Sequence, residues 1–330
     1  MKILIVSGFL GAGKTTFIRE LIRRTGTAPV VLENEYGDNS IDAQELKQTE
    51  GNGIKAPEIL EFMEGCVCCT MKDSFVNSVL TVYAGLSPGY LIVEPTGVGK
   101  LSNILANLQP IMKGDISLLR PVVVLSPGSF RRNMAEFPAL YSDQIAHAQT
   151  VVFSKCENEM PELLQKTEEE IRGINPDAAV ISRHYSAMED SWWRSVMELP
   201  AEDPSVEEAE DEVSSFSQIT VKHPRLQNPA QLILLLEDCL RGELGHVVRA
   251  KGTLHAGSHP LRFDLADGLY AISDSPDAQD QCVFIGEPLD RSKICERLGS
   301  SLTEESMNPG AAASVRRPGK ENTPGKIRPR

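Results

Sequence analysis

The segment that most restricts the possible folds is Gly8–Thr15, which satisfies the pattern G-x-x-x-x-G-K-[ST] at every fixed position. It follows the apolar run Ile3–Ser7 and opens the helix-length segment Thr15–Arg24, which is the context in which this pattern forms a phosphate-binding loop. Glycines let backbone N–H groups curl around a phosphate without Cβ clashes, and the helix N-terminus adds partial positive charge. A glycine-rich turn that binds nothing is the alternative, and the length and placement of the motif argue against it.

Each polar residue of this loop has an expected role at a nucleotide. Lys14 is expected to reach the β- and γ-phosphates and to act in catalysis. The Thr15 hydroxyl is expected to bind magnesium, and Thr16 is expected to hydrogen-bond the α-phosphate. The predicted nucleotide-binding residues of this loop are Gly8, Gly11, Ala12, Gly13, Lys14, Thr15 and Thr16.

A second element of a nucleotide site is Tyr90–Gly97, an apolar run that ends in the acid Glu94. A carboxylate at the end of a buried strand is where triphosphatases hold magnesium, and the Gly97 N–H would then sense the γ-phosphate. The alternative is a buried strand with an acid at its exposed end. The phosphate-binding loop in the same chain favours the magnesium role, so Glu94 is predicted to be catalytic together with Lys14.

Residues 1–200 alternate short β-branched runs with helix-length segments. Alternation of this kind predicts crossover units, and therefore an α/β fold in which helices cover both faces of a mostly parallel sheet. The expected strands are Ile3–Ser7, Val30–Glu33, Ile59–Phe62, Leu91–Val93, Pro121–Leu125, Thr150–Ser154 and Ala178–Ile181; the clearest helices are Thr15–Arg24, Asp73–Tyr83 and Glu162–Ile174.

The chain is too long for one ordinary domain, and its composition changes near residue 201. Residues 201–214 contain seven acids and no apolar period, which predicts an acidic linker. Residues 215–300 are expected to form a smaller α+β domain, with helices at Pro229–Leu240 and Ser292–Leu298. Its expected strands are Phe216–Val221, Val247–Leu254, Leu269–Ile272 and Cys282–Ile285, and residues 306–330 are predicted to be a disordered basic tail.

Three thiols lie within four residues at Cys66, Cys68 and Cys69. They can supply three soft ligands to one ion if the loop curls back, with Glu35, Asp38 or a water as the fourth ligand. Zinc suits such ligands best, while cobalt, nickel, iron(II) and copper(I) stay open. A packed cysteine cluster and a redox pair are the alternatives.

Charge and cysteine usage exclude several classes of protein. The net charge is −13, and without the basic residues 307–330 the balance is more acidic still, which argues against nucleic acid as a partner. No stretch of about 18 apolar residues occurs, so no membrane span is expected. Seven cysteines in a chain of this length indicate a cytoplasmic protein with a metal or redox site rather than a disulfide framework. Cys239, Cys282 and Cys295 are isolated in apolar surroundings and are expected in the core.

Four motifs follow one another along the chain: GFLGAGKTT, NEYGDNSID at Asn34–Asp42, EGCVCCT at Glu64–Thr70 and EPTG at Glu94–Gly97. With these motifs in this order, the chain resembles the CobW-like GTPases, relatives of the nickel chaperones UreG and HypB. The stretches Arg249–Gly252 and Val283–Gly286 look like the C-terminal domain of the family. The resemblance implies a GTPase whose nucleotide state is coupled to a metal at the cysteine motif. It also implies that Asn34–Asp42 is a switch in which Glu35 and Asp38 contact magnesium or the metal.

One motif departs from the family pattern. The family carries N-K-x-D for guanine, whereas the matching place here reads Ser154-Lys155-Cys156-Glu157. Glu157 can accept from the guanine amines, and the stem of Lys155 can lie on the ring. Ser154 lacks the amide that would tie the loop together, so guanine preference is expected to be weaker and an ATP-using activase stays open. Cys156 is expected to be a neutral filler.

The leading hypothesis is a GTP-hydrolysing metallochaperone that binds magnesium and a transition metal, zinc or cobalt first. It would deliver the metal to a client metalloprotein or metal-cofactor enzyme, and a homodimer is possible. The alternative is a nucleotide-gated adaptor or activase for a metalloenzyme, with a structural cysteine site. The predicted metal residues are Cys66, Cys68, Cys69, Thr15 and Glu35, and the predicted base-binding residues are Lys155 and Glu157.

Overall fold

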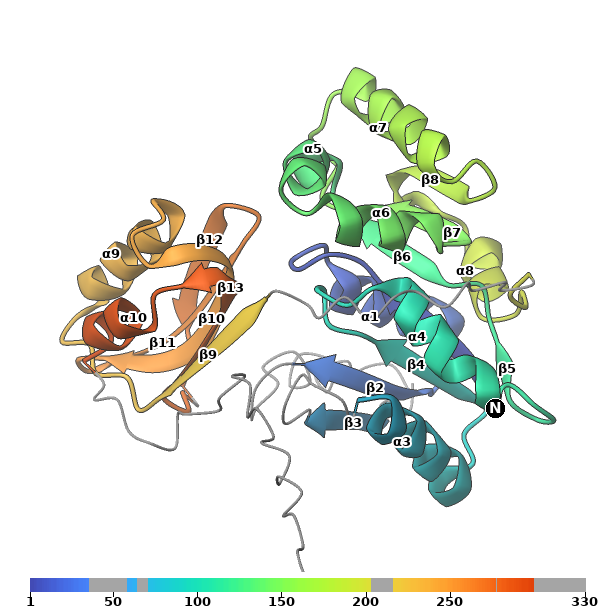
Figure 1. The fold of residues 1–330 in the computed structure, drawn as a ribbon, viewed down its shortest axis with the longest axis horizontal. Coiled ribbons are helices and arrows are strands. Elements are labelled where there is room, and N and C mark those ends of the chain that lie inside the picture. The colour runs from blue at the N-terminus through green and yellow to red at the C-terminus, as the bar shows by residue number, and fades with distance from the viewer. Residues whose placement is uncertain (36–57, 64–70, 203–215, 277, 300–330) are drawn as a thin grey trace, which may run out of the picture.

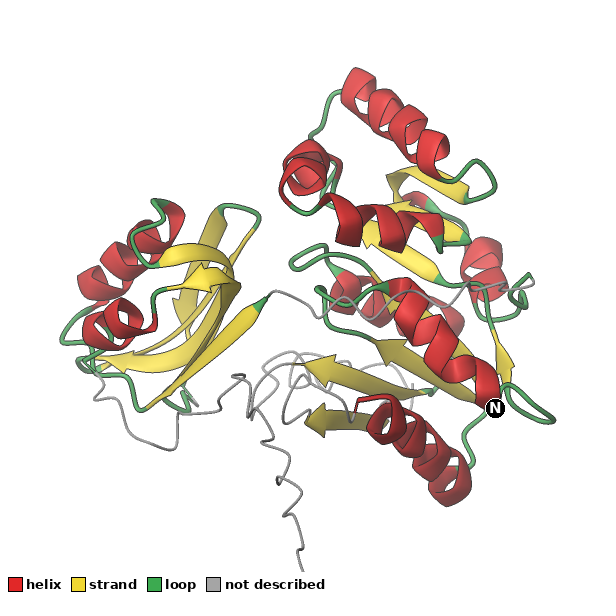
Figure 2. Ribbon diagram, in the orientation of Figure 1, coloured by secondary structure: helices red, strands yellow, loops and turns green. Residues whose placement is uncertain are grey.

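The computed structural model describes residues 1–35, 58–63, 71–202, 216–276 and 278–299, which form an eight-stranded sheet and a five-stranded sheet (Figures 1 and 2). We call residues 1–202 the N-terminal part and residues 216–299 the C-terminal part. The strands of the N-terminal part are β1 (Lys2–Ser7), β2 (Val30–Glu35), β3 (Glu58–Met63), β4 (Tyr90–Glu94), β5 (Ser117–Leu118), β6 (Val122–Leu125), β7 (Thr150–Phe153) and β8 (Ala179–His184). Its α-helices are α1 (Lys14–Thr25), α3 (Met71–Leu86), α4 (Leu101–Leu108), α5 (Pro127–Glu136), α6 (Pro138–Ala146), α7 (Pro161–Ile174) and α8 (Asp190–Val196).

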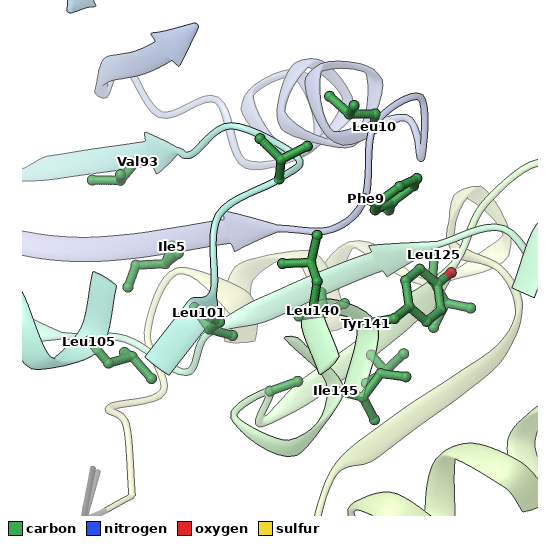
Figure 3. Close-up of a cluster of buried hydrophobic side chains, with 14 of the residues drawn as sticks. Ile5, Phe9, Leu10, Val93, Leu101, Leu105, Leu125, Leu140, Tyr141 and Ile145 are labelled. Carbon is green, nitrogen blue, oxygen red and sulfur yellow. The ribbon is translucent and has the colours of Figure 1, made fainter. Parts of the chain in front are cut away.

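The larger sheet is parallel, in the order β3-β2-β4-β1-β6-β7-β8, with β5 pairing beside β1. Its central strand β1 has apolar side chains on both faces, and helices cover both of these faces. Ile3 and Ile5 pack with α4 and α6, whereas Leu4 and Val6 pack with α1 and α8 (Figure 3 shows the first of these cores). Full burial of each such side chain contributes about 1.5–3 kcal/mol to folding.

The helix α1 is amphipathic, and its apolar face lies on the sheet. Phe17, Ile18, Leu21 and Ile22 recur at helical spacing and are buried. The helix ends at Gly26, whose left-handed backbone lets its N–H bond the carbonyl of Ile22. This helix starts at the carboxyl end of β1, the edge at which open α/β sheets bind their ligands.

The smaller sheet is antiparallel, in the order β12-β11-β10-β13-β9. Leu261, Phe263 and Leu265 of β11 alternate between polar residues and pack in one core under α9 and α10. The elements of the C-terminal part are β9 (Ser217–Lys222), α9 (Pro229–Leu240), β10 (Gly245–Ala256), β11 (His259–Ala266), β12 (Leu269–Asp274), β13 (Gln281–Leu289) and α10 (Arg291–Arg297).

The two parts pack against each other through the second face of the antiparallel sheet. In β13, Cys282 and Phe284 face α9 and α10, while Val283 and Ile285 join the core of the N-terminal part. The ring of Phe137 at the start of α6 lies 4.9 Å from that of Phe216, measured between ring centroids. The strand β13 is thus buried on both faces from Cys282 to Gly286.

The predicted fold class is confirmed: a parallel sheet with helices on both faces, followed by a smaller part with an antiparallel sheet. The strand β11 lies in a stretch, residues 255–268, for which the sequence predicted no element. The three isolated cysteines of the C-terminal part, Cys239, Cys282 and Cys295, are buried as expected. The predicted acidic linker, apart from its first residues, and the predicted basic tail lie outside the described residues. No helix in the described ranges has the length and apolar character of a membrane span.

Candidate nucleotide site

The predicted phosphate-binding loop joins the carboxyl end of β1 to the start of α1. At its first position a side chain is excluded: a Cβ on Gly8 would lie 2.1 Å from the carbonyl oxygen of Val124, and φ is 140°. Gly11 and Gly13 have φ of 75° and 90°, which residues with a side chain rarely adopt. The glycines therefore fix a tight curve whose N–H groups can surround an anion.

Lys14 is held inside this curve. Its side chain is buried, and Nζ donates to the carbonyl oxygens of Gly8 at 3.1 Å and Phe9 at 3.3 Å. A buried ammonium needs partners of this kind because burial strongly disfavours an uncompensated charge. The two carbonyls hold the cation at the mouth of the loop, where phosphate oxygens would meet it.

Thr15 and Glu94 lie together although 79 residues separate them. The Thr15 hydroxyl donates to the Glu94 carboxylate, at 2.9 Å from Oε1 and 3.2 Å from Oε2. A hydroxyl and a carboxylate are oxygen ligands of the type that magnesium takes. Glu33, for which the sequence predicted no role, is buried on β2 directly beside Glu94 in the sheet register. The only sequence feature that could have indicated a role for Glu33 is the presence of an acid at the end of an apolar run.

The loop after β4 touches the phosphate-binding loop at Gly97. A Cβ at this position would lie 2.4 Å from the backbone nitrogen of Leu10 and 2.8 Å from the carbonyl carbon of Phe9. The buried side-chain amide of Gln144 donates to the carbonyl oxygens of Gly97 at 3.3 Å and Gly99 at 3.1 Å. Gln144 thus positions this loop. The sequence did not indicate this role, because α6 is far along the chain from the loop that Gln144 contacts.

Residues 154–157, the predicted base-recognition loop, follow β7 and are tied to the phosphate-binding loop. The buried Ser154 hydroxyl is 2.6 Å from the carbonyl oxygen of Ala12, to which it donates. This corrects the expectation that the absence of an amide leaves the loop untied, because the shorter side chain makes the link with its hydroxyl. Cys156 is buried, and burial raises the pKa of its thiol, in keeping with a filler role.

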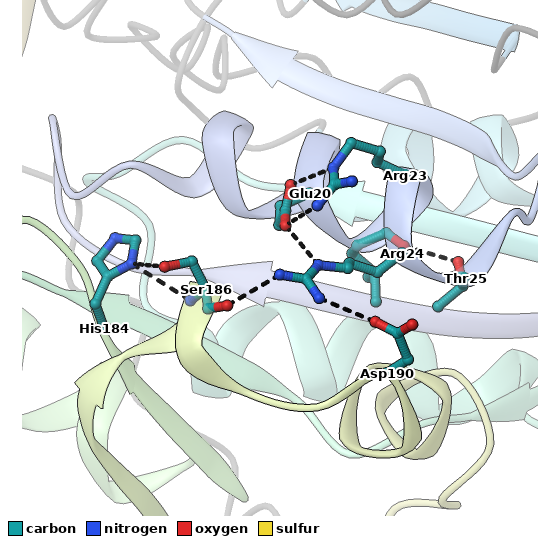
Figure 4. Close-up of polar contacts among 8 residues, drawn as sticks. Glu20, Arg23, Arg24, Thr25, His184, Ser186 and Asp190 are labelled. Atoms are coloured by element: carbon teal, nitrogen blue, oxygen red, sulfur yellow. Dashed lines mark hydrogen bonds and ion pairs between the residues drawn. The ribbon is translucent and has the colours of Figure 1, made fainter. Parts of the chain in front are cut away.

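Lys155 and Glu157 both lie at the surface. Lys155 has a left-handed backbone with φ of 51°, and its side chain is half exposed. A Glu157 carboxylate oxygen lies 3.2 Å from Nε2 of His184, which ends β8. The Ser186 N–H donates to the other ring nitrogen of His184, and the Ser186 carbonyl accepts from Arg24 of α1 (Figure 4). His184, which the sequence analysis missed, therefore links the base-recognition loop to α1.

Two of the five predicted metal residues, Thr15 and Glu35, lie among the described residues. Glu35 ends β2, while Cys66, Cys68 and Cys69 lie outside the described residues. Glu35 and Met63 are partners in the register of β2 and β3, at the edge that also carries Glu94. Within the described ranges, no group of three histidine, cysteine, aspartate or glutamate side chains is arranged to hold a metal ion.

Two family models match the chain. The CobW/HypB/UreG nucleotide-binding domain matches residues 2–182, and the cobalamin synthesis protein cobW C-terminal domain matches residues 216–302. The chain belongs to the CobW/HypB/UreG family. Both matches confirm the resemblance drawn from the motifs. The stretch that matches the nucleotide-binding domain contains the phosphate-binding loop, Glu94 and residues 154–157.

Relatives in this family bear names that refer to zinc. The zinc-regulated GTPase metalloprotein activator 1 of Schizosaccharomyces pombe is 27% identical over 194 residues, which are 58% of this chain and 47% of that protein. The zinc chaperone YjiA of Escherichia coli is 23% identical over 317 residues, which are 89% of this chain and 96% of that protein. The crystal structure of Zn(II)-bound YjiA GTPase from E. coli is 17% identical with a TM-score of 0.43, covering 91% of this chain and 98% of that one. The chain spans about half the length of the yeast protein.

Proposed function

We propose that this chain is a GTP-hydrolysing metallochaperone. It binds GTP and magnesium in the N-terminal part, carries a transition metal at Cys66, Cys68 and Cys69, and delivers the metal to a client metalloprotein or metal-cofactor enzyme. Zinc is the proposed metal, because the ligands are thiolates and because the named relatives are zinc chaperones or zinc-regulated activators.

One observation carries the proposal: the strands before the switch segment and before the cysteine motif end side by side at the nucleotide edge. Glu35 and Met63 are register partners, and Glu33 on the same strand pairs with Glu94. Cys66 follows Met63 by three residues, and three residues reach at most about 10 Å. A metal held by the cysteine motif would therefore lie within reach of the loops that contact the γ-phosphate.

The nucleotide chemistry follows from the described side chains. Lys14, fixed at the mouth of the glycine loop, neutralises phosphate charge as it develops. Thr15 and Glu94 are the residues that would hold magnesium, which when bound supplies further charge neutralisation. Gly97 contacts the phosphate-binding loop closely enough to report on its occupancy through the loop after β4.

Coupling between the two ligands has a definite thermodynamic form. If the metal changes the affinity for GTP by some factor, GTP changes the affinity for the metal by the same factor. Typical coupling free energies are about 1–3 kcal/mol, or about 5- to 150-fold. Hydrolysis would then convert a state that holds the metal tightly into one that releases it to a client. The basal turnover is expected to be slow.

The test measures zinc stoichiometry and GTP turnover on the same preparations of wild type and of the variant C66S/C68S/C69S. About one zinc per chain in wild type, lost in the variant with unchanged tryptophan emission, supports metal carriage. Loss of the folded state in the variant would instead indicate a structural zinc site. A wild-type GTPase rate that zinc or cobalt does not change would refute the coupling.

Base preference is tested separately, by binding of GTP and ATP to the wild-type protein. Tighter GTP binding is expected because Glu157 can accept from the guanine N1 and N2 groups, which adenine does not offer in the same pattern. If ATP binds as tightly as GTP or more tightly, the proposed substrate is ATP and not GTP. The proposal of metal carriage would then still depend on the zinc stoichiometry of wild type and C66S/C68S/C69S.

A further inference from the structure

The turn between β11 and β12 brings residues of the C-terminal part against the phosphate-binding loop. A Cβ on Gly11 would lie 2.6 Å from the Cβ of Ala266 and 3.4 Å from Oδ2 of Asp267. Absence of a side chain at Gly11 therefore serves two purposes: it permits the curve of the loop, and it leaves room for this hairpin. The contact places a carboxylate from outside the nucleotide-binding domain at the edge of the nucleotide site.

The carboxylate of Asp267 is held by two cations of the N-terminal part. Oδ2 accepts from Nζ of Lys155 at 3.0 Å, and Oδ1 lies 3.6 Å from Nη2 of Arg132 on α5. Arg132 also donates to the main-chain oxygen of Asp267 at 3.1 Å. The Asp267 side chain is only 11% exposed, so water screens these interactions less than it would at an open surface.

The hairpin presents this carboxylate rigidly. Asp267 and Gly268 have φ of 56° and 73°, the pair of left-handed residues that a two-residue turn of type I′ requires. The turn joins two strands paired without irregularity from Leu261 to Ala266. Asp267 is therefore fixed before any ligand arrives, whereas Lys155 is half exposed and has a flexible stem.

We propose that Asp267 is a positioning residue for the nucleotide base, supplied by the C-terminal part. It anchors the ammonium of Lys155, and the anchored stem then lies where the purine ring packs. The inference rests on the proposed function, because it takes residues 154–157 as the base-recognition loop. It also makes docking of the C-terminal part and binding of a purine nucleotide mutually dependent.

The decisive experiment compares D267N with wild type for two ligands of the magnesium-loaded full chain: a fluorescent GTP analogue and inorganic tripolyphosphate. Asparagine keeps the shape of the side chain and tolerates the left-handed backbone, so the turn should persist. We expect GTP binding to weaken about three- to tenfold, a loss between that of an exposed ion pair and that of a buried charged hydrogen bond. Tripolyphosphate has no base, so its binding is expected to stay unchanged.

Two comparisons separate positioning from general damage. The control D274N makes the same change on an exposed acid at the far end of β12 and is expected to bind GTP as wild type does. In the K155M background, which keeps the stem and removes the ammonium, D267N is expected to add no further loss. Equal weakening of GTP and tripolyphosphate by D267N, or no weakening of either, would overturn the inference. Failure of the wild type to bind GTP at all would instead count against the proposed function.

Discussion

The hydrogen bond from Ser154 to the phosphate-binding loop gives a prediction that can be worked through in numbers. The Ser154 side chain is 2% exposed, and its hydroxyl donates to the carbonyl oxygen of Ala12 at 2.6 Å. Replacement by alanine removes the donor and leaves a small void. A buried neutral hydrogen bond contributes about 0.5–1.5 kcal/mol, so S154A is expected to unfold about 1 kcal/mol more easily than wild type.

The assay is urea unfolding followed by tryptophan emission. Both tryptophans of the chain, Trp192 and Trp193, lie in α8, and Trp193 packs on Phe17 of α1 with ring centroids 5.2 Å apart. Their emission therefore reports on the core beside the phosphate-binding loop rather than on the C-terminal part. The expected result is a lower midpoint with an unchanged slope, since the surface exposed on unfolding stays the same.

A matched control comes from Ser102 on α4, which is as deeply buried. Among the described residues, its hydroxyl has no hydrogen-bond partner. S102A is therefore expected to be neutral or slightly stabilising, because it removes a buried polar group that gains little from the fold. If S154A unfolds at the wild-type midpoint, or if S102A loses as much stability as S154A, the assigned role of Ser154 is wrong.

Three further predictions concern the site and its surroundings. E94Q keeps an acceptor for the Thr15 hydroxyl but removes the charge, so magnesium-dependent turnover is expected to fall about 10²-fold, as measured by phosphate release at saturating GTP. R132A removes contacts to the hairpin turn, whereas R131A removes an exposed ion pair with Glu170. Of these two variants, only R132A is expected to speed protease cleavage between the two parts and to weaken GTP binding. Burial raises the pKa of Cys239 to about 12, whereas the thiol of the unfolded chain ionises near pH 8.5. Ionisation of the unfolded chain therefore lowers the stability of the folded protein as the pH rises above about 8.5. In C239A, the urea midpoint is expected to fall less between pH 8 and 10 than it does in wild type.

Much of the geometry of the candidate nucleotide site could be predicted because its residues follow strands directly. Gly8, Glu94 and Ser154 each come after an apolar run, and parallel strands bring their carboxyl ends to one edge. The sheet therefore gathers residues that are far apart along the chain. The pairing of Thr15 with Glu94 follows from this rule, as does the position of the base-recognition loop beside the phosphate-binding loop.

The roles of Asp267, Gln144 and His184 could not be predicted, because they depend on contacts between elements that the order of the strands does not specify. Asp267 meets Lys155 only because the antiparallel sheet docks on the N-terminal part, and docking is decided by shape and apolar area rather than by a motif. The hairpin itself was recoverable: Asp267-Gly268 between alternating apolar residues is a strong turn signal. Gln144 binds backbone carbonyls, and His184 joins the Glu157 carboxylate to a backbone N–H, so neither role leaves a pattern in the sequence.

The alternation of side chains along β13 limits how this strand can change over evolution. Inserting or deleting one residue would turn Val283 and Ile285 toward α9 and would direct Phe284 at α6 and its neighbours. Both cores would lose their fitted side chains at once, at a cost far above the few kcal/mol by which domains are stable. Length variation among homologues is therefore expected in the turns on either side of this strand and not within it.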